Sequence, residues 1–254
     1  MPSDNRSVHF RYLLRLADDT LVLGHRLSEW SSRAPTLEQD IALSNIALDL
    51  IGQARALYTH AGAVEGKGRS EDDLAYLRDA NQFLNLQLVE RPNGDFAATM
   101  ARQLLYSAFA TQLWGALCAS ADRELAGIAA KAEKECTYHL RHSSEWVIRL
   151  GDGTEESRGR MQREINDAWM FSGELFELDT DERELIGSGV AIDASMLRPA
   201  WNRTVGDVLD QATLRRPADG WMVTGGRRGI HTEHLGHMLA PMQFLQRVYP
   251  GARW

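Results

Sequence analysis

Carboxylate and imidazole side chains lie at helical spacing in one segment of this chain. His139 and His142 are three residues apart, and Glu135 precedes His139 by about one turn. Residues three or four apart on a helix share a face, so these side chains could point at the same ion. A pair of this kind, completed by a distant ligand, could bind zinc. A role at the edge of a core or at an interface is the plainer alternative.

A second group of histidines lies near the end of the chain. His231, His234 and His237 follow one another at three-residue steps, with Glu233 among them. Three-residue steps drift by ~60° per pair around a helix, so the outer two side chains diverge. One metal ion cannot easily bind all three, and the spacing favours a helix N-terminal, interface or core-edge role.

The elements that would position these side chains are helices. Apolar residues recur at three- and four-residue steps from Val8 to Trp30, which is typical of one face of a long helix. A second helix is predicted from a capping box at Thr36 and Gln39 to about Tyr58. The short turn between the two implies that they are antiparallel neighbours.

The next segments complete a four-helix pattern. Residues 62–94 contain glycines, a polar stretch and a small helix, and they are too long for a hairpin loop, so they fit a crossover connection. A third long helix is predicted over residues 95–120 and a fourth over 122–150. Two long helices, a crossover and two more long helices are the order of a ferritin-like bundle. The sequence therefore predicts an all-α fold of this class, as a single domain over residues 1–254.

Additional helices are predicted after the bundle. They lie at about Glu155–Phe176, Asp181–Ile186, Thr204–Leu214 and His231–Val248. The stretch 190–203 and the segment Trp221–Thr224 could each hold a short strand.

A ferritin-like bundle often holds two iron ions, and this sets a test for the sequence. The site requires one Glu from each of two helices and a Glu-x-x-His motif from each of the other two. No Glu or Asp in this chain has a His three residues later, and the third long helix carries no carboxylate from Phe96 to Ala121. A complete oxygen-activating centre is therefore not expected, and no catalytic, cofactor-binding or metal-binding residue is assigned.

Four residues could be remnants of such a centre. Glu29 lies on the first helix, and Asp49 on the second is followed at the required step by a glycine. On the fourth helix, Glu135 is followed at that step by Tyr138, and His139 comes one residue later. The alternative for each is a helix-surface carboxylate or a buried polar contact. Their placement on three different long helices favours a vestigial di-iron site.

Other catalytic motifs are absent or weak. The chain has neither a Gly-x-Ser-x-Gly elbow nor a Walker loop. The loop Gly225–Gly229 could hold a phosphate through its N–H groups and the guanidinium groups of Arg227 and Arg228, although a tight turn explains it as well. The seven tryptophans lie mostly at helical spacing, which predicts packing: Trp30, Trp114, Trp146, Trp169, Trp201, Trp221 and Trp254.

Composition excludes several kinds of partner. The 254 residues carry 28 Lys and Arg against 35 Asp and Glu, a net charge of −7, so nucleic acid is not an expected partner. Two cysteines, Cys118 and Cys136, exclude a disulfide scaffold and are predicted to be buried free thiols. No signal peptide and no apolar run of 18 residues is found, so we expect a cytoplasmic protein without a membrane partner.

Several longer strings resemble one family. They are LGHRLSEW at 23–30, IALDLIGQ at 46–53, YHLRH at 138–142 with SEWVIRLGDG at 144–153, and GIHTEHLG at 229–236. From about residue 8 to Gln246, the chain is similar to the C subunits of the bacterial phenylacetyl-CoA 1,2-epoxidase, also called ring-1,2-phenylacetyl-CoA monooxygenase.

The resemblance implies a role as well as a fold. C subunits of this family are ferritin-like, lack a working di-iron centre and pair as structural partners with the homologous catalytic A subunit. The full system, which acts in aerobic phenylacetate breakdown, adds a reductase with flavin and iron–sulfur groups that takes electrons from NADPH. The assembled enzyme places one oxygen atom on the aromatic ring of phenylacetyl-CoA. No cofactor is then expected in this chain, di-iron is expected in its partner, and self-association of the chain is left open.

Two other functions remain open at this stage. One is a self-sufficient ferritin-like di-iron oxygenase or iron-binding protein with a divergent ligand set, which iron content would reveal. The other is a helical module that binds an acidic or CoA-like ligand through Arg227 and Arg228.

Overall fold

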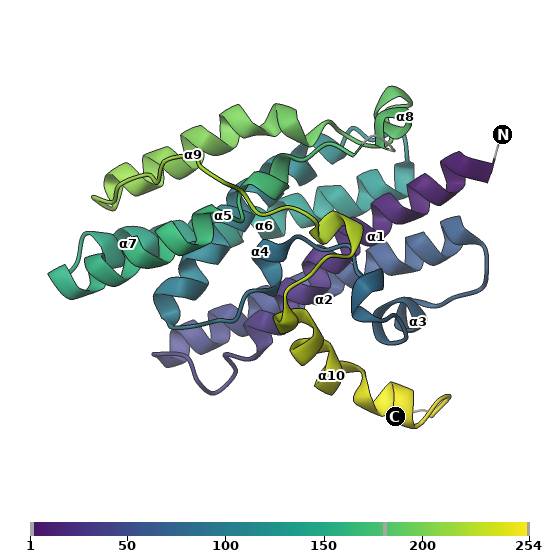
Figure 1. Ribbon diagram of the computed structural model, residues 1–254, viewed down its shortest axis with the longest axis horizontal. Helices are drawn as coiled ribbons and strands as arrows, with labels where there is room; N and C mark the ends of the chain where they lie inside the picture. Colours follow the sequence, from purple (N-terminus) through teal and green to yellow (C-terminus); the bar gives the residue numbers. More distant parts are fainter. Residues whose placement is uncertain (1–2, 180–181, 253–254) are drawn as a thin grey trace.

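Four long helices form the body of the molecule in the computed structural model, which describes residues 3–179 and 182–252 (Figure 1). They are α1 (Ser3–Ser28), α2 (Leu37–Glu65), α5 (Phe96–Leu117) and α6 (Arg123–Gly151). α1 packs along α2, α5 packs along α6, and α2 also contacts α6. The predicted all-α, ferritin-like class is confirmed.

The helix starts follow the capping residues in the sequence. Thr36 accepts a hydrogen bond from the Gln39 N–H (3.4 Å), and Asp95 accepts one from the Ala98 N–H (2.9 Å). Each bond satisfies a backbone donor that the first turn leaves free.

The second helix is longer than predicted. It continues past Tyr58 to Glu65, because the residues that follow Tyr58 include alanines that extend a helix without cost. It ends where Gly66 takes a left-handed conformation with φ +68°, which favours glycine.

The crossover between α2 and α5 is built from short helices. These are α3 (Glu71–Tyr76), the 3₁₀ turn η1 (Ala80–Gln82) and α4 (Gln87–Glu90). The connection passes beside α1, which α4 contacts directly.

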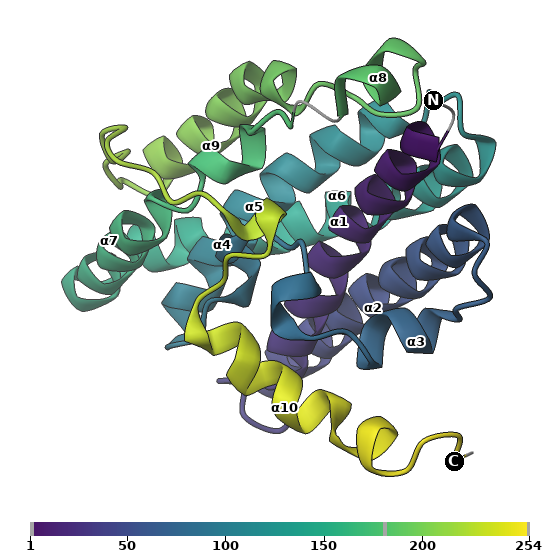
Figure 2. The same cartoon turned by 45° about the vertical axis from the view of Figure 1, so that its right-hand side comes forward.

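The rest of the chain covers the α5–α6 pair and returns to the crossover. It contains α7 (Glu155–Trp169), η2 (Gly173–Phe176), α8 (Glu182–Gly187), η3 (Ala194–Leu197), α9 (Arg198–Gln211), η4 (Gly226–Arg228) and α10 (Glu233–Val248). α7 and α9 pack on α5 and α6, whereas α10 lies at the edge of the molecule beside α3 (Figure 2). No helix of the described chain is long and apolar enough to cross a membrane.

Three local predictions need correction. The helix predicted over 155–176 ends at Trp169, where a turn and the 3₁₀ helix η2 follow. The helix predicted over 204–214 begins earlier, at Arg198, because Pro199 at its first turn preorganises the backbone. The described residues contain no strand, and 190–203 instead holds η3 and the start of α9. Asp181, the predicted start of a small helix, lies outside the described residues.

Most tryptophans pack as predicted. Trp201 is buried on α9 and donates a hydrogen bond from Nε1 to the Leu105 carbonyl of α5 (2.9 Å), which joins the two helices. Its ring also lies 5.5 Å from that of Trp169. Trp221 is the exception, with 75% of its surface exposed, and Trp254 lies outside the described residues.

A buried ion pair joins α1 to the crossover. Asp18 is fully buried and pairs with Arg78, which also donates to the Gln82 carbonyl (2.9 Å). The Asp18 carboxylate accepts further hydrogen bonds from the Tyr58 hydroxyl and the Leu84 N–H. All members of a buried polar network must be satisfied for it to be stable.

We predict that Arg78→Met destabilises the protein by about 3–5 kcal/mol, because Asp18 then stays buried without its cation. Urea unfolding measured by circular dichroism would give the difference in the free energy of unfolding.

The matched control is Arg160→Met. Arg160 pairs with Glu156 on the exposed side of α7, where an ion pair contributes about 1 kcal/mol or less. Equal losses for the two variants would contradict the assignment of Arg78 to a stabilising buried network.

Candidate functional site in the bundle interior

Three of the four predicted remnant positions lie together between α2 and α6. His139 is buried on α6, and its Nε2 lies 3.1 Å from the Asp49 carboxylate on α2. One turn along each helix, Glu135 accepts a hydrogen bond from the Gln53 amide (2.8 Å). The two helices therefore face each other through these polar pairs.

The fourth predicted position is not part of this group. Glu29 lies one residue beyond the end of α1, and 43% of its side chain is exposed. It binds Arg26 (2.9 Å) and the Asn93 amide (3.1 Å) near the start of α5. The first helix ends before Glu29, so this carboxylate lies at the surface and does not face the interior.

α5 presents polar side chains, but no carboxylate, to the interior. Arg102, Gln103, Tyr106 and Ser107 are all buried on this helix. Arg102 donates to the Asn93 side-chain oxygen (2.6 Å), and burial together with nearby cations lowers its pKa to about 9. The amide oxygen of Gln103 has no hydrogen-bond partner.

Cys136 faces the interior from α6 and is buried, as predicted. Burial raises the pKa of its thiol far above the usual value, and the neighbouring Gln53 amide opposes this only in part. A protonated thiol is a poor metal ligand and a poor nucleophile. Cys118, by contrast, is exposed at the end of α5, which corrects its predicted burial.

The donor set of this interior does not fit a di-iron centre. The bundle site needs four carboxylates and two histidines at fixed steps. Between α2 and α6 lie two carboxylates that are partly exposed or paired, two histidines, a neutral thiol and an amide, and α5 contributes an arginine and no acid. The buried acids of α1, Asp18 and Asp19, are already paired with Arg78 and Arg227. Among the described residues, one group of three His, Cys, Asp or Glu side chains has its ligand atoms within 4.8 Å of one another, and that group lies outside this interior.

The remaining predicted histidines do not form a shared site. His142 contacts Gln39 of α2 (2.9 Å), and burial lowers its pKa. His231 lies before α10 and binds Glu90 through Nδ1 and the Phe83 carbonyl through Nε2, both at 2.8 Å. His237 is exposed on α10. His231 and His237, although both belong to the three-residue series, therefore lie in separate environments.

The loop Gly225–Gly229 packs into the protein and is not a phosphate cradle. Arg227 is largely buried and pairs with Asp19 on α1 (2.8 Å), and it also donates to the Leu84 carbonyl. The Gly226 N–H donates to the Glu174 carboxylate (2.6 Å), and a Cβ at this glycine would lie 2.3 Å from a backbone oxygen. The Arg227 guanidinium and the N–H groups of Gly226, Arg228 and Gly229 are thus already used within the fold. The exposed Arg228 guanidinium lies 3.7 Å from Glu177.

Several polar residues of the interior were missed from the sequence. Gln53 ends the string IALDLIGQ, but neither Gln53 nor Tyr106 belongs to a ligand or catalytic motif that would assign its side chain to the interior. The periodicity of the long helices is the one signal that could have placed them, because Gln53 lies at helical steps from the buried residues Leu50 and Leu57.

The contacts of His231 predict a pH-dependent stability. Burial opposes its charge, but the hydrogen bonds to Glu90 and to the Phe83 carbonyl raise its pKa above 6.5. Two acceptors can be satisfied only by the imidazolium. The stabilisation is therefore complete below about pH 6.5 and is lost as the pH rises through the raised value, with a slope of up to about 1.4 kcal/mol per pH unit.

Unfolding of the protein and of His231→Gln between pH 6 and 9 tests this. The free energies of the two should converge as the pH rises. A constant difference would show that the imidazolium is not the stabilising form.

The different exposure of the two cysteines predicts different rates of thiol modification. A thiol reagent at pH 8 should modify Cys118 rapidly in the folded chain and leave Cys136 unmodified, because thiolate formation at Cys136 is disfavoured and the side chain is inaccessible. Denaturation should expose the second thiol. Fast modification of both in the folded protein would contradict the packing of α6.

Comparison with known proteins agrees with this architecture. Residues 1–254 match the family described as phenylacetic acid catabolic protein. The chain is 51% identical over 243 residues to the C subunit of the 1,2-phenylacetyl-CoA epoxidase of Escherichia coli (strain K12), and the match covers 96% of this chain and 98% of the relative. The chain therefore belongs to the phenylacetic acid catabolic protein family.

Proposed function

We propose that this chain is a non-catalytic structural subunit of a multicomponent di-iron oxygenase that epoxidises the aromatic ring of phenylacetyl-CoA. The identity to a relative named as an epoxidase subunit supports the reaction and the existence of partner subunits. The interior supports the non-catalytic role, because α5 has no carboxylate from Phe96 to Leu117, whereas a di-iron bundle needs one from each of its helices.

The proposal divides the chemistry among the partners. A homologous catalytic subunit would hold the two irons, and a reductase with flavin and iron–sulfur groups would deliver electrons from NADPH. This chain, as one domain in the cytoplasm, would supply a rigid bundle against which the catalytic subunit is stabilised. The Asp49, Glu135 and His139 group would then be a vestige of the ancestral ligands, now used to pair α2 with α6.

An exposed apolar stripe on α2 is our candidate for the contact with the catalytic subunit. Leu37, Ile41 and Leu48 are 73%, 53% and 66% exposed. At 100° per residue they fall within ~40° of one another on the helix, so they form one line. Apolar stripes of this kind are normally covered by a partner. Obligate subunit interfaces bury roughly 2,000–5,000 Å², for which one long helix face is a suitable centre.

Iron content is the first test. The chain purified alone from iron-supplemented cells should contain iron well below one equivalent after chelator treatment, because its interior donors do not form the bundle site. Two irons per chain would contradict the proposal and favour a self-sufficient di-iron enzyme with a divergent ligand set. Colorimetric iron analysis on the full chain gives the answer directly.

Co-expression with the catalytic subunit tests the structural role. We expect the catalytic subunit to be insoluble or inactive when expressed without this chain. Leu48→Glu should weaken the complex at least roughly tenfold, since a charge would be buried at the interface. Pull-down and epoxidation assays measure both effects.

The control variant is Gln211→Glu. It adds the same charge at an exposed position at the end of α9 and should leave the complex intact. A catalytic subunit that is soluble and fully active alone would overturn the proposal, and equal effects of the two variants would exclude the α2 stripe.

A further inference from the structure

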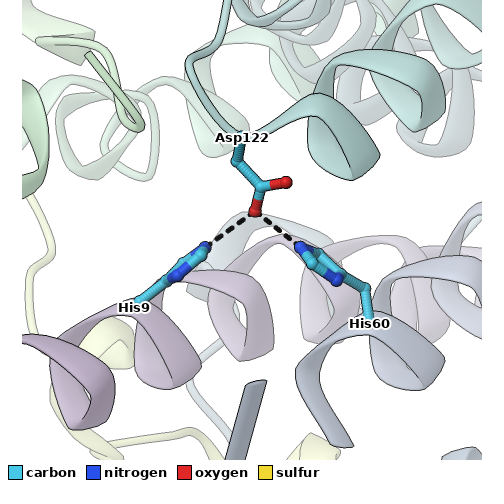
Figure 3. Close-up of side chains that lie close together, drawn as sticks. All are labelled: His9, His60 and Asp122. Carbon is cyan, nitrogen blue, oxygen red and sulfur yellow. Dashed lines mark hydrogen bonds and ion pairs between the residues drawn. The ribbon is translucent and has the colours of Figure 1, made fainter. Parts of the chain in front are cut away.

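Three side chains of types that can bind a metal ion lie together at one end of the bundle. They are separate from the Asp49, Glu135 and His139 group and from the apolar stripe on α2. His9 comes from α1, His60 from the last turns of α2 and Asp122 from the start of α6 (Figure 3). Asp122 Oδ2 lies 3.0 Å from His9 Nε2 and 2.6 Å from His60 Nε2. The two imidazole rings meet edge to face, with centroids 5.9 Å apart. All three ligand atoms lie within 4.8 Å of one another.

The carboxylate of Asp122 is held in place by the helix that it caps. Its Oδ1 accepts hydrogen bonds from the N–H groups of Glu124 (2.9 Å) and Leu125 (3.1 Å) at the start of α6. This leaves Oδ2 directed at the two histidines, as Figure 3 shows. Outer contacts that fix a ligand's orientation are the usual support of a metal site.

The imidazole of His9 has no hydrogen-bond partner at its Nε2. The nitrogen is buried, and although Oδ2 of Asp122 is close, it is not aligned for a hydrogen bond. A neutral imidazole carries one nitrogen lone pair, so Nε2 of His9 could coordinate an ion placed beside Oδ2 of Asp122.

We propose that His9, His60 and Asp122 bind a zinc ion, with one nitrogen from each histidine and Oδ2 of the aspartate as ligands. Two imidazoles and one carboxylate form a set that suits Zn²⁺ and not Mg²⁺ or Ca²⁺, which prefer oxygen alone. Zinc bonds of about 2.0–2.2 Å in a tetrahedron place the donors roughly 3.4 Å apart. Small side-chain rotations from the present spacing reach that distance.

The surroundings allow the ion to enter. The side chains of His9, His60 and Asp122 are 19%, 13% and 10% exposed, so the cluster is shielded but not sealed. Surface hollows adjoin it on both sides, one lined by His60 and the other by His9, and Ala63 borders both. A small side chain at this position leaves room for a water molecule as the fourth ligand.

Zinc at this place would join three helices at the end of the bundle. His60 lies eleven residues beyond Asp49 on α2, which is ~16 Å along the helix axis. The ion would therefore not touch the Asp49, Glu135 and His139 group. It would tie the first turns of α1 to the end of α2 and the start of α6.

Asp122→Asn is the variant that separates metal binding from folding. Asparagine caps a helix about as well as aspartate, so α6 should start as before, while the charged ligand is lost. The full chain, stripped with a chelator, is titrated with ZnCl₂ and followed by calorimetry and thermal unfolding. We expect one zinc per chain and a rise in Tm of roughly 5–10 °C at a hundredfold excess over Kd.

Asp122→Asn and His60→Gln should bind zinc at least roughly tenfold more weakly and lose the rise in Tm. His237→Gln, on the exposed face of α10, is the control and should behave like the unchanged protein. A titration with Co²⁺ in place of zinc tests the coordination directly, because the visible absorption of bound Co²⁺ depends on the geometry and the type of its ligands.

Two results would overturn the proposal. One is the lack of saturable binding at one ion per chain. The other is equal zinc affinity in the protein and in Asp122→Asn, with metal-free melting points that agree. In either case the three side chains form only a polar contact between helix ends.

Discussion

Two adjacent buried aspartates on α1 are the constraint on which the rest of the structure depends. Asp18 requires Arg78 of the crossover, and Asp19 requires Arg227 of the loop before α10. Asp19 also accepts the Leu86 N–H (2.8 Å), and burial still raises its pKa to about 6. Neighbouring carboxylates in an apolar interior are tolerated only when each has a cation. The crossover and the C-terminal loop must therefore dock on α1 for the bundle to be stable.

The same network explains why the last part of the chain belongs to the body and is not an appendage. Glu90 of α4 receives His231 and the Thr232 N–H, and Glu174 receives the N–H groups of Gly226 and Gln87. Each buried carboxylate accepts hydrogen bonds from donors that are far from it in the sequence. The loop Gly225–Gly229, which resembles an anion site in sequence, thus binds the protein's own carboxylates.

The sequence predicted the features that depend on neighbouring residues, and it did not predict contacts between residues far apart in the chain. Helical periodicity and capping residues located the four long helices and the crossover, because both signals depend on neighbours within a few positions. They could not show that α1 ends before Glu29, that Cys118 faces solvent, or that Arg227 pairs with Asp19. His9, His60 and Asp122 come from three helices and share no motif, so only the packing of the helix ends brings them together.

The polar groups of the interior bear on the scaffold role proposed above. A di-iron site keeps charged ligands close together in the core, and this is costly in a protein without metal. Here α5 offers amides, a tyrosine and an arginine that reaches out to Asn93, and Cys136 is held neutral by burial. Asp49 and Glu135 lie at the α2–α6 edge, partly in contact with solvent, and each has a partner. The buried Asp18 and Asp19 of α1 are neutralised by Arg78 and Arg227. Under the proposed role, a core of this kind would keep its shape without an ion, and the chemistry would be left to the partner chain.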